Sequence, residues 1–280
     1  MSGTLYLVTT PIGNLEDMSF RAIRILKEVD LIAAEDTRTS RPLLDHFEIN
    51  TPTTSYHKFN ERDKGAELVA GILGGKNVAV ITDAGTPAIS DPGEILVKLC
   101  IENNIPIVAV PGPTAFVTAL TVSGMDTGRF VFEGFISRDK KERKKTISRI
   151  ANDTGTIIIY ESPHHIVRTL EELGRELGDR RIALCRELTK KFEEIVRTTI
   201  SGALDYFQER EPRGEYVVLI EGRSAEEIER ENSRQWEGLS AAEHVAYYES
   251  RGADHKEAMK MAAKDRGVSK RDIYNELLKL

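Results

Sequence analysis

The chain has 280 residues, which is long enough for two α/β domains of about 100 residues each and a small additional unit. Hydrophobic residues make up 40% of it and charged residues 30%, as in ordinary globular proteins, and no apolar run approaches the roughly 20 residues that cross a bilayer. The formal net charge of −6 excludes a generally basic, histone-like binder. With no signal-peptide pattern and only two cysteines, Cys100 and Cys185, the sequence predicts a cytoplasmic protein with reduced thiols and no membrane segment.

Short apolar strands alternate with helices in the first part of the chain. This alternation predicts a largely parallel sheet covered on both faces, with ligands at the carboxyl ends of its strands. We expect strands at residues 4–9, 30–34, 77–82 and 106–110, and helices after Ser19 and at residues 66–73 and 95–101.

The pattern restarts after the small residues at 121–128, where we place a boundary between domains 1–123 and 124–222. The second domain is predicted to be a more mixed α/β domain, with an antiparallel pair formed by residues 192–199 and 216–220. Its other strands are expected at 129–134, 156–160 and 181–185, and its helices at 140–151 and 166–177.

An acidic segment, 223–238, is predicted to link this domain to a small helical unit at 239–280. Ser240, Asp254 and Ser269 each stand three residues before a carboxylate, which is the pattern of a helix start. Three short helices indicate either a helix-turn-helix-like unit or a helical cap packed on the main body.

Charge is unevenly distributed. Residues 138–149 carry seven basic and two acidic side chains, and residues 251–280 carry eight basic and five acidic ones. Such patches can bind a polyanion even in an acidic chain, although solvated helix faces would have the same composition. The predicted RNA contacts are Lys140, Lys141, Arg143, Lys144, Lys145, Lys190 and Lys191, together with the C-terminal helices.

Three turns rich in glycine and proline follow predicted strands: TPIGN at residues 10–14, DAGTPAISDPG at 83–93 and PGPTA at 111–115. Glycine lets the backbone approach a ligand closely, and proline holds a turn in one shape. Together the turns predict one rigid cleft lined by backbone groups, suited to a flat, partly apolar ligand such as adenosine. The usual phosphate-binding, nucleophile-elbow and metal-binding motifs are absent from the sequence, and no metal site is expected.

Seven segments stand in a characteristic order between residues 5 and 222: LYLVTTPIGNLEDMSFRA, AAEDTR, VAVITDAGTPAISDPG, VAVPGPTA, FEGF, IIIYESPHH and GEYVVLIEG. In this order and spacing they resemble the tetrapyrrole-methylase-like family of methyltransferases, most closely its branch that modifies ribosomal RNA. The eleven-residue run DAGTPAISDPG is the most specific of them.

The resemblance implies two α/β domains with S-adenosylmethionine in the cleft between them, in a homodimer. It also implies methyl transfer to the ribose 2′-hydroxyl of a cytidine in the decoding region of small-subunit ribosomal RNA, within the RNA or the ribosomal subunit. The cofactor-binding residues that it implies, with their neighbours in the same turns, are Pro11, Gly13, Asp83, Ala84, Gly85, Thr86, Pro87, Ile89, Thr114, Ala115 and Tyr160.

Two positions depart from the family pattern. Relatives that act on tetrapyrroles often carry Asp where this chain has Thr86, so no role of that carboxylate is transferred. His165 stands where close relatives carry Arg.

A ribose hydroxyl is a poor nucleophile, so a positioned base or cation is expected near the reacting atoms. The selected catalytic candidates are Glu161, Asp36 and Arg38. Further candidates in similar loops are Glu35, His57, Glu61, Arg186, Glu187, Lys190 and Lys191. Two alternatives remain open, a small-molecule methyltransferase that acts on a tetrapyrrole and a non-catalytic RNA-binding protein. The basic segments favour an RNA substrate over a tetrapyrrole, and the three turns argue against a protein without a cofactor.

Overall fold

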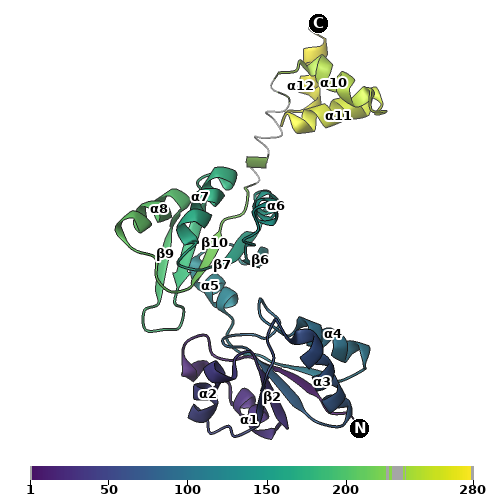
Figure 1. Ribbon diagram of the computed structural model, residues 1–280. Helices are drawn as coiled ribbons and strands as arrows, with labels where there is room; N and C mark the ends of the chain where they lie inside the picture. The colour runs from purple at the N-terminus through teal and green to yellow at the C-terminus, as the bar shows by residue number, and fades with distance from the viewer. Residues whose placement is uncertain (1, 225–226, 229–235, 237, 279–280) are drawn as a thin grey trace. The chain divides into compact units, whose positions relative to one another are not determined.

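The computed structural model describes residues 2–224, 227–228, 236 and 238–278. The described chain divides into two compact units, one formed by residues 1–150 and 156–221 and the other by 151–155 and 222–280. The first unit contains two five-stranded sheets, and the described part of the second contains helices between residues 241 and 277 (Figure 1). The predicted fold class is confirmed. The finer division of the sequence at residues 123 and 222 stays a prediction.

The first sheet is parallel throughout, with the strand order β3-β2-β4-β1-β5. Because β4, β1 and β5 are neighbours, the three Gly/Pro-rich turns leave the same edge of one sheet, as the sequence predicts. The strands are β1 (Leu5–Val8), β2 (Leu31–Ala34), β3 (Thr53–Ser55), β4 (Val78–Ile81) and β5 (Ile107–Val110).

Apolar clusters cover both faces of this sheet. On one face, Leu26 of α1 (Phe20–Glu28) and Leu44 of α2 (Thr37–His46) pack in a cluster that includes Ile81. On the other face, Ile72 of α3 (Glu61–Leu73) and Leu96 of α4 (Glu94–Glu102) pack in a cluster that includes Val80. All four residues of β4 are buried, as expected for a central strand with helices on both sides.

The second sheet is mixed, with the order β6-β7-β10-β8-β9. Its strands are β6 (Phe130–Phe135), β7 (Thr156–Glu161), β8 (Arg181–Arg186), β9 (Glu194–Thr199) and β10 (Tyr216–Ile220), and β6 and β7 are its one parallel pair. The prediction that residues 192–199 pair with 216–220 is wrong. Instead, β10 lies between β7 and β8, and β9 pairs with β8, because the wholly apolar β10 occupies the buried centre of the sheet.

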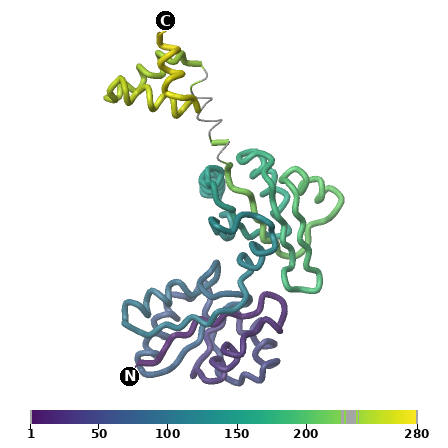
Figure 2. Tube along the Cα trace, turned by 180° about the vertical axis from the view of Figure 1, so that it is seen from behind, coloured from purple at the N-terminus to yellow at the C-terminus, as the bar shows by residue number. Residues whose placement is uncertain are grey.

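Helix α5 (Ala115–Ser123) packs on one face of the second sheet, where Ala119 and Leu120 share a cluster with Ile158 and Leu219. The trace of this region is seen from behind in Figure 2. The other helices of the domain are α6 (Lys140–Ile150), α7 (Ile166–Leu177) and α8 (Ile200–Glu209).

The C-terminal unit has its own core, in which Val245, Ala258, Met259 and Ile273 are buried. Ser240 and Ser269 form capping boxes and Asp254 accepts a hydrogen bond from the Glu257 amide, so the three predicted helix starts are confirmed. The helices are α10 (Ala241–Glu249), α11 (His255–Asp265) and α12 (Lys270–Leu277). In the part of the chain that the structure describes, no helix is long and apolar enough to cross a membrane.

Candidate functional site

The three strand-end turns are joined by hydrogen bonds. Thr10 and Gly85 exchange two backbone hydrogen bonds, of 2.9 and 3.1 Å, as an antiparallel bridge. The Thr86 hydroxyl lies 2.8 Å from that of Thr114 and 3.5 Å from that of Thr9. These contacts connect the turns after β1, β4 and β5 into one framework, so a ligand would meet a largely preformed surface.

A cavity of about 300 Å³ opens beside this framework, with walls from both sheets of the first unit. From the first sheet and α5 it is lined by Ile12, Glu35, Asp83, Ala84, Gly85, Thr86, Ile89, Ser90, Asp91, Thr114 and Ala115. From the second sheet it is lined by Phe135, Tyr160, Glu161, Cys185, Glu187, Leu188, Lys190, Glu215, Tyr216 and Val217.

Most of the cofactor-binding residues implied by the family resemblance line this cavity: Asp83, Ala84, Gly85, Thr86, Ile89, Thr114, Ala115 and Tyr160. Pro11, Gly13 and Pro87 do not line the cavity. In the turn after β1, Ile12 lines it, whereas its neighbours Pro11 and Gly13 do not. A Cβ on Gly13 would lie 2.3 Å from Cγ of Lys190, so Gly13 allows the turn after β1 to lie against the loop after β8.

Several lining residues went unnoticed in the sequence because they do not follow a parallel strand. Tyr216 begins β10 and pairs with Arg186 at the end of β8, since the two strands are antiparallel. The sequence pattern places Glu187 in a strand-end loop but gives no such signal for Glu215, Tyr216 or Val217, which lie where β10 begins. Phe135 could have been noticed as an apolar residue at the carboxyl end of β6.

Acidic side chains from two loops meet on the first-sheet side of the cavity. The Asp36 amide donates to Asp83 Oδ1 at 3.2 Å, and the Asp83 amide donates to Glu35 Oε2 at 3.4 Å. Burial, together with the negative charges of Glu35 and Asp83, raises the pKa of Asp91 to about 7. Burial likewise raises the pKa values of Glu35 and Asp83, so this wall favours a cationic ligand group that would relieve the repulsion.

On the opposite wall, Lys190 is held by two carboxylates. Its Nζ lies 2.9 Å from Glu187 Oε1 and 3.7 Å from Glu215 Oε2. Burial opposes ionisation of Glu187, but the hydrogen bond from the Glu215 amide and the contact with Lys190 outweigh it and lower the pKa of Glu187. The ammonium group that was predicted to contact RNA therefore forms ion pairs at the cavity wall.

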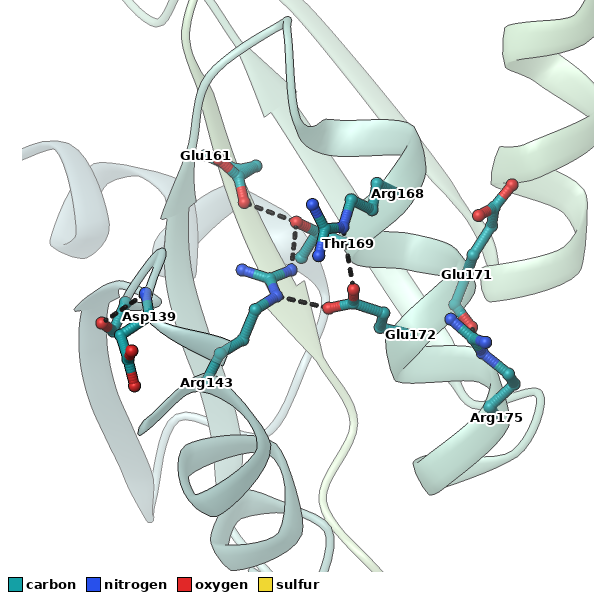
Figure 3. A network of polar contacts seen from close by, with 9 residues as sticks. Asp139, Arg143, Glu161, Arg168, Thr169, Glu171, Glu172 and Arg175 are labelled. Carbon is teal, nitrogen blue, oxygen red and sulfur yellow. Dashed lines mark hydrogen bonds and ion pairs between the residues drawn. The ribbon is translucent and has the colours of Figure 1, made fainter. Parts of the chain in front are cut away.

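Glu161 is buried, 6% exposed, and lies at the head of a polar network (Figure 3). Its carboxylate accepts hydrogen bonds from the Thr169 hydroxyl at 2.6 Å and from the Ser162 amide at 2.8 Å. The Thr169 hydroxyl in turn accepts from Arg143 Nη2 at 2.7 Å. Each Glu161 oxygen is thus fixed by one donor and keeps acceptor capacity toward the cavity that it lines.

The other two catalytic candidates lie elsewhere. Asp36 is the N-cap of α2 and accepts from the Arg38 amide at 2.8 Å, while its carboxylate forms an exposed ion pair with the Arg38 guanidinium at 2.7 Å. These bonds lower the pKa of Asp36 to about 2. Neither Asp36 nor Arg38 lines the cavity, although Glu35, which precedes them in the same loop, does.

The basic helix α6 is exposed at four of its five predicted RNA contacts: Lys140, Lys141, Lys144 and Lys145. Arg143 differs, because its side chain is buried and forms an ion pair with Glu172 of α7 in addition to its bond to Thr169. The guanidinium packs α6 against α7, which favours a structural role over the predicted RNA contact. Lys191 is exposed and its Nζ lies 5.6 Å from the ring centroid of Phe192.

Comparisons with known proteins bear on this site. A profile of the tetrapyrrole (corrin/porphyrin) methylases matches residues 4–203 of the chain. The chain belongs to this family. Among curated relatives of this methylase, the ribosomal RNA small subunit methyltransferase I of Halalkalibacterium halodurans is 48% identical over 273 residues, which cover 98% of this chain and 94% of the relative. The protein of the same name from Synechocystis is 42% identical over 282 residues, covering 99% and 98%.

Solved structures show the same fold. This methylase matches a diphthine synthase with a TM-score of 0.63 at 11% identity, covering 79% of this chain and 91% of that one. It matches a cobalt precorrin-4 methyltransferase with a TM-score of 0.59 at 19% identity, covering 78% and 94%. A uroporphyrin-III C-methyltransferase from Thermus thermophilus, solved with bound S-adenosylhomocysteine, matches with a TM-score of 0.57 at 19% identity, covering 78% and 97%.

Proposed function

We propose that this chain transfers a methyl group from S-adenosylmethionine to the ribose 2′-hydroxyl of a cytidine in the decoding region of small-subunit ribosomal RNA. The observation that carries the proposal is its 42–48% identity, over nearly the whole chain, to relatives named as ribosomal RNA small subunit methyltransferases. The cytidine, the 2′-oxygen and the decoding region come from the family resemblance of the sequence motifs.

The residues of the cavity suit this cofactor. S-adenosylmethionine supplies a methyl group on a sulfonium cation, which is transferred by in-line displacement. Backbone groups of Gly85 and Thr86 can meet its polar edges, and the acidic wall at Asp83 and Asp91 complements its positive charge. Lys190 is the one cation among the described lining residues and already contacts two carboxylates, so the cavity is poorly suited to a polyphosphate.

Glu161 is the best placed of the predicted catalytic residues. Its carboxylate lines the cavity, is fixed by Thr169 and Ser162, and can accept the hydrogen bond or the proton of a ribose hydroxyl. Alignment of the hydroxyl with the departing sulfur supplies much of the remaining rate enhancement.

RNA would be held by exposed basic side chains. We assign this role to Lys140, Lys141, Lys144 and Lys145 of α6, to Lys191, and to the basic C-terminal helices. Phosphate contacts of this kind would make the affinity strongly dependent on salt. A homodimer in the cytoplasm completes the proposal; sedimentation of the purified protein tests the dimer.

One experiment tests the function. The protein is incubated with S-adenosylmethionine labelled in its methyl group and with small ribosomal subunits, naked ribosomal RNA or a corrin-type tetrapyrrole, and the label is located after digestion to nucleosides. The proposal expects labelled 2′-O-methylcytidine. Label on the tetrapyrrole would favour the small-molecule alternative, and no cofactor binding in calorimetry would contradict both enzymatic functions.

A further inference from the structure

A second cavity adjoins the cofactor cavity. Its size is about 370 Å³, and Phe135 and Glu161 line both cavities. Arg138, Arg143, Arg168 and Thr169 also line the second cavity. A methyl acceptor has to reach the cofactor from a neighbouring space, and the shared wall contains the carboxylate best placed to receive the acceptor's proton.

The aromatic side chain of the shared wall, Phe135, is exposed. Phe135 ends β6 with 60% of its surface accessible, and its ring centroid lies 5.5 Å from that of Tyr160 at an interplanar angle of 64°. An exposed ring at a cavity mouth provides a surface on which a nucleobase can stack.

A bulge in β6 gives Phe135 this position. The pairing with β7 shifts between Phe132 and Gly134, so that Phe132 lies opposite Ile158 and Phe135 opposite Tyr160. In a regular strand, residues three apart point to opposite faces, but the extra residue places both phenylalanines on the face of Tyr160. Gly134 has a φ of +64°, a conformation that favours glycine, and a Cβ there would lie 2.9 Å from the Ser90 hydroxyl.

Basic side chains outnumber acidic ones in the lining of the second cavity. Three arginines line it, against the single carboxylate of Glu161. Arg143 is buried and bonds to Thr169 and Glu172 (Figure 3). The side chain of Arg168 is 65% exposed, and its guanidinium also pairs with Glu172, at 2.9 Å. Arg138 is exposed and has no ion pair within the described ranges of the chain. Both exposed guanidinium groups line the same cavity, and guanidinium groups bind phosphate by charge-assisted hydrogen bonds.

We propose that Phe135 and this second cavity form the subsite for the acceptor nucleotide of the RNA. Its base stacks on Phe135, a phosphate next to it is bound by Arg138 and Arg168, and its ribose then lies at Glu161 beside the cofactor. The inference rests on the proposed RNA methylation and adds the residues that position the reacting nucleotide.

Steady-state methylation of small ribosomal subunits at saturating cofactor tests the subsite. Phe135→Leu is expected to raise the KM for RNA about tenfold, the loss typical of one stacking contact, whereas Phe135→Tyr retains a KM near that of the wild type. Arg138→Ala and Arg168→Ala are each expected to raise the KM and to lower the slope of log KM against log salt concentration by about 1. Cofactor affinity, measured by calorimetry, is expected to stay unchanged in both arginine variants.

Matched variants separate these effects from general losses. Arg175→Ala removes a cation from the same helix, α7, at a position outside the cavity, and Phe59→Leu removes a phenylalanine that is 95% exposed near α3. Arginine variants that behave like Arg175→Ala would overturn the phosphate contacts, and Phe135→Leu behaving like Phe59→Leu would overturn the stacking. A wild-type chain that binds the cofactor and methylates no RNA would overturn the proposed function together with the subsite.

Discussion

Gly85 shows how one residue supports the cofactor cavity. Its φ of +87° is unfavourable for a side chain, both of its backbone groups bond to Thr10, and a Cβ would lie 3.4 Å from Ile12 Cγ2. We expect Gly85→Val to abolish cofactor binding in calorimetry while circular dichroism still shows a folded chain, because a branched side chain would push Ile12 and the turn into the cavity.

Gly124 supplies the control for backbone strain. It has a similar φ of +76°, but a Cβ there would meet nothing within 4 Å, and the residue lies outside the cavity. Gly124→Val is expected to lose stability and to keep its cofactor affinity. If both variants bind the cofactor as the wild type does, the role given to the turn after β4 is wrong.

Asp91 makes stability depend on pH in an unusual direction. The pKa of its carboxyl group is about 7 in the folded chain against an ordinary value of 3.8, so the unfolded chain ionises first. The cost of ionising Asp91 in the folded chain therefore lowers the free energy of unfolding progressively as the pH rises from about 4 to about 7. Above pH 7 this cost is complete and stays constant. Asp91→Asn removes that penalty and should raise the free energy of unfolding by about 1–2 kcal/mol at pH 8, after allowance for solvent screening.

Urea unfolding at pH 5 and pH 8 measures this difference. Asp205→Asn, a change at an exposed position of α8, controls for the loss of one surface charge. An Asp91→Asn variant whose advantage over the wild type is the same at both pH values would refute the prediction.

The sequence pattern predicts the turns that line the cavity where one parallel strand leads into one Gly/Pro turn. The turns that contain Thr86 and Thr114 are examples, because the local pattern indicates both the strand and the turn, while the family resemblance supplies the individual residues. The pattern fails for Glu215 and Tyr216, which reach the cavity only because β10 runs antiparallel to β8. Strand direction depends on long-range pairing, which a local apolar pattern does not encode.

At the scale of elements, the contact between α6 and α7 shows that the basic side chains at 138–149 do not all have the same role. Arg143 is nearly buried and bonds to Glu172 and Thr169, so its charge stabilises the packing of two helices. We expect Arg143→Leu to lower the free energy of unfolding by about 2–3 kcal/mol, less than for an isolated buried pair because Arg168 still contacts Glu172.

Lys144→Leu provides the comparison, since Lys144 is the next residue of α6 and is exposed. This variant should change stability little and weaken RNA binding, whereas Arg143→Leu should mainly lose stability in urea unfolding. Equal stability losses in the two variants would contradict the separation of structural and RNA-contacting cations on this helix.

Elements with clear apolar periodicity were predictable, and elements with ambiguous composition were not. Helix α2 is polar and contains Pro42, and α5 consists of small, β-branched and apolar residues that could form either structure. Both are fixed by packing: Leu44 of α2 is buried in the first sheet's core, and Ala119 of α5 is buried against the second sheet. Tertiary contacts determine the secondary structure of such segments more than local propensity does.

At the scale of the whole molecule, cofactor and RNA binding are expected to separate along the chain. Every residue that lines the cofactor cavity belongs to the first compact unit, while the C-terminal helices form a second unit with its own core. Residues 251–280 carry eight basic and five acidic side chains, which suits a role in holding RNA. A chain that ends at Arg223 should therefore keep its cofactor affinity within about twofold and show a KM for small ribosomal subunits raised about tenfold or more, the loss expected when several phosphate contacts are removed.

A full-length variant distinguishes lost charge from a lost domain. Lys260 and Lys264 are exposed one turn apart on α11, so Lys260→Glu with Lys264→Glu reverses charge on one helix face and leaves the buried core of the unit in place. If the C-terminal unit binds phosphate groups, this variant should weaken RNA binding in the same direction as truncation and reduce its salt dependence, both measurable by titration of labelled RNA at several salt concentrations. A truncated chain with an unchanged KM would assign RNA binding to the first unit alone. If truncation raises the KM and charge reversal does not, the C-terminal unit acts through its shape and apolar contacts.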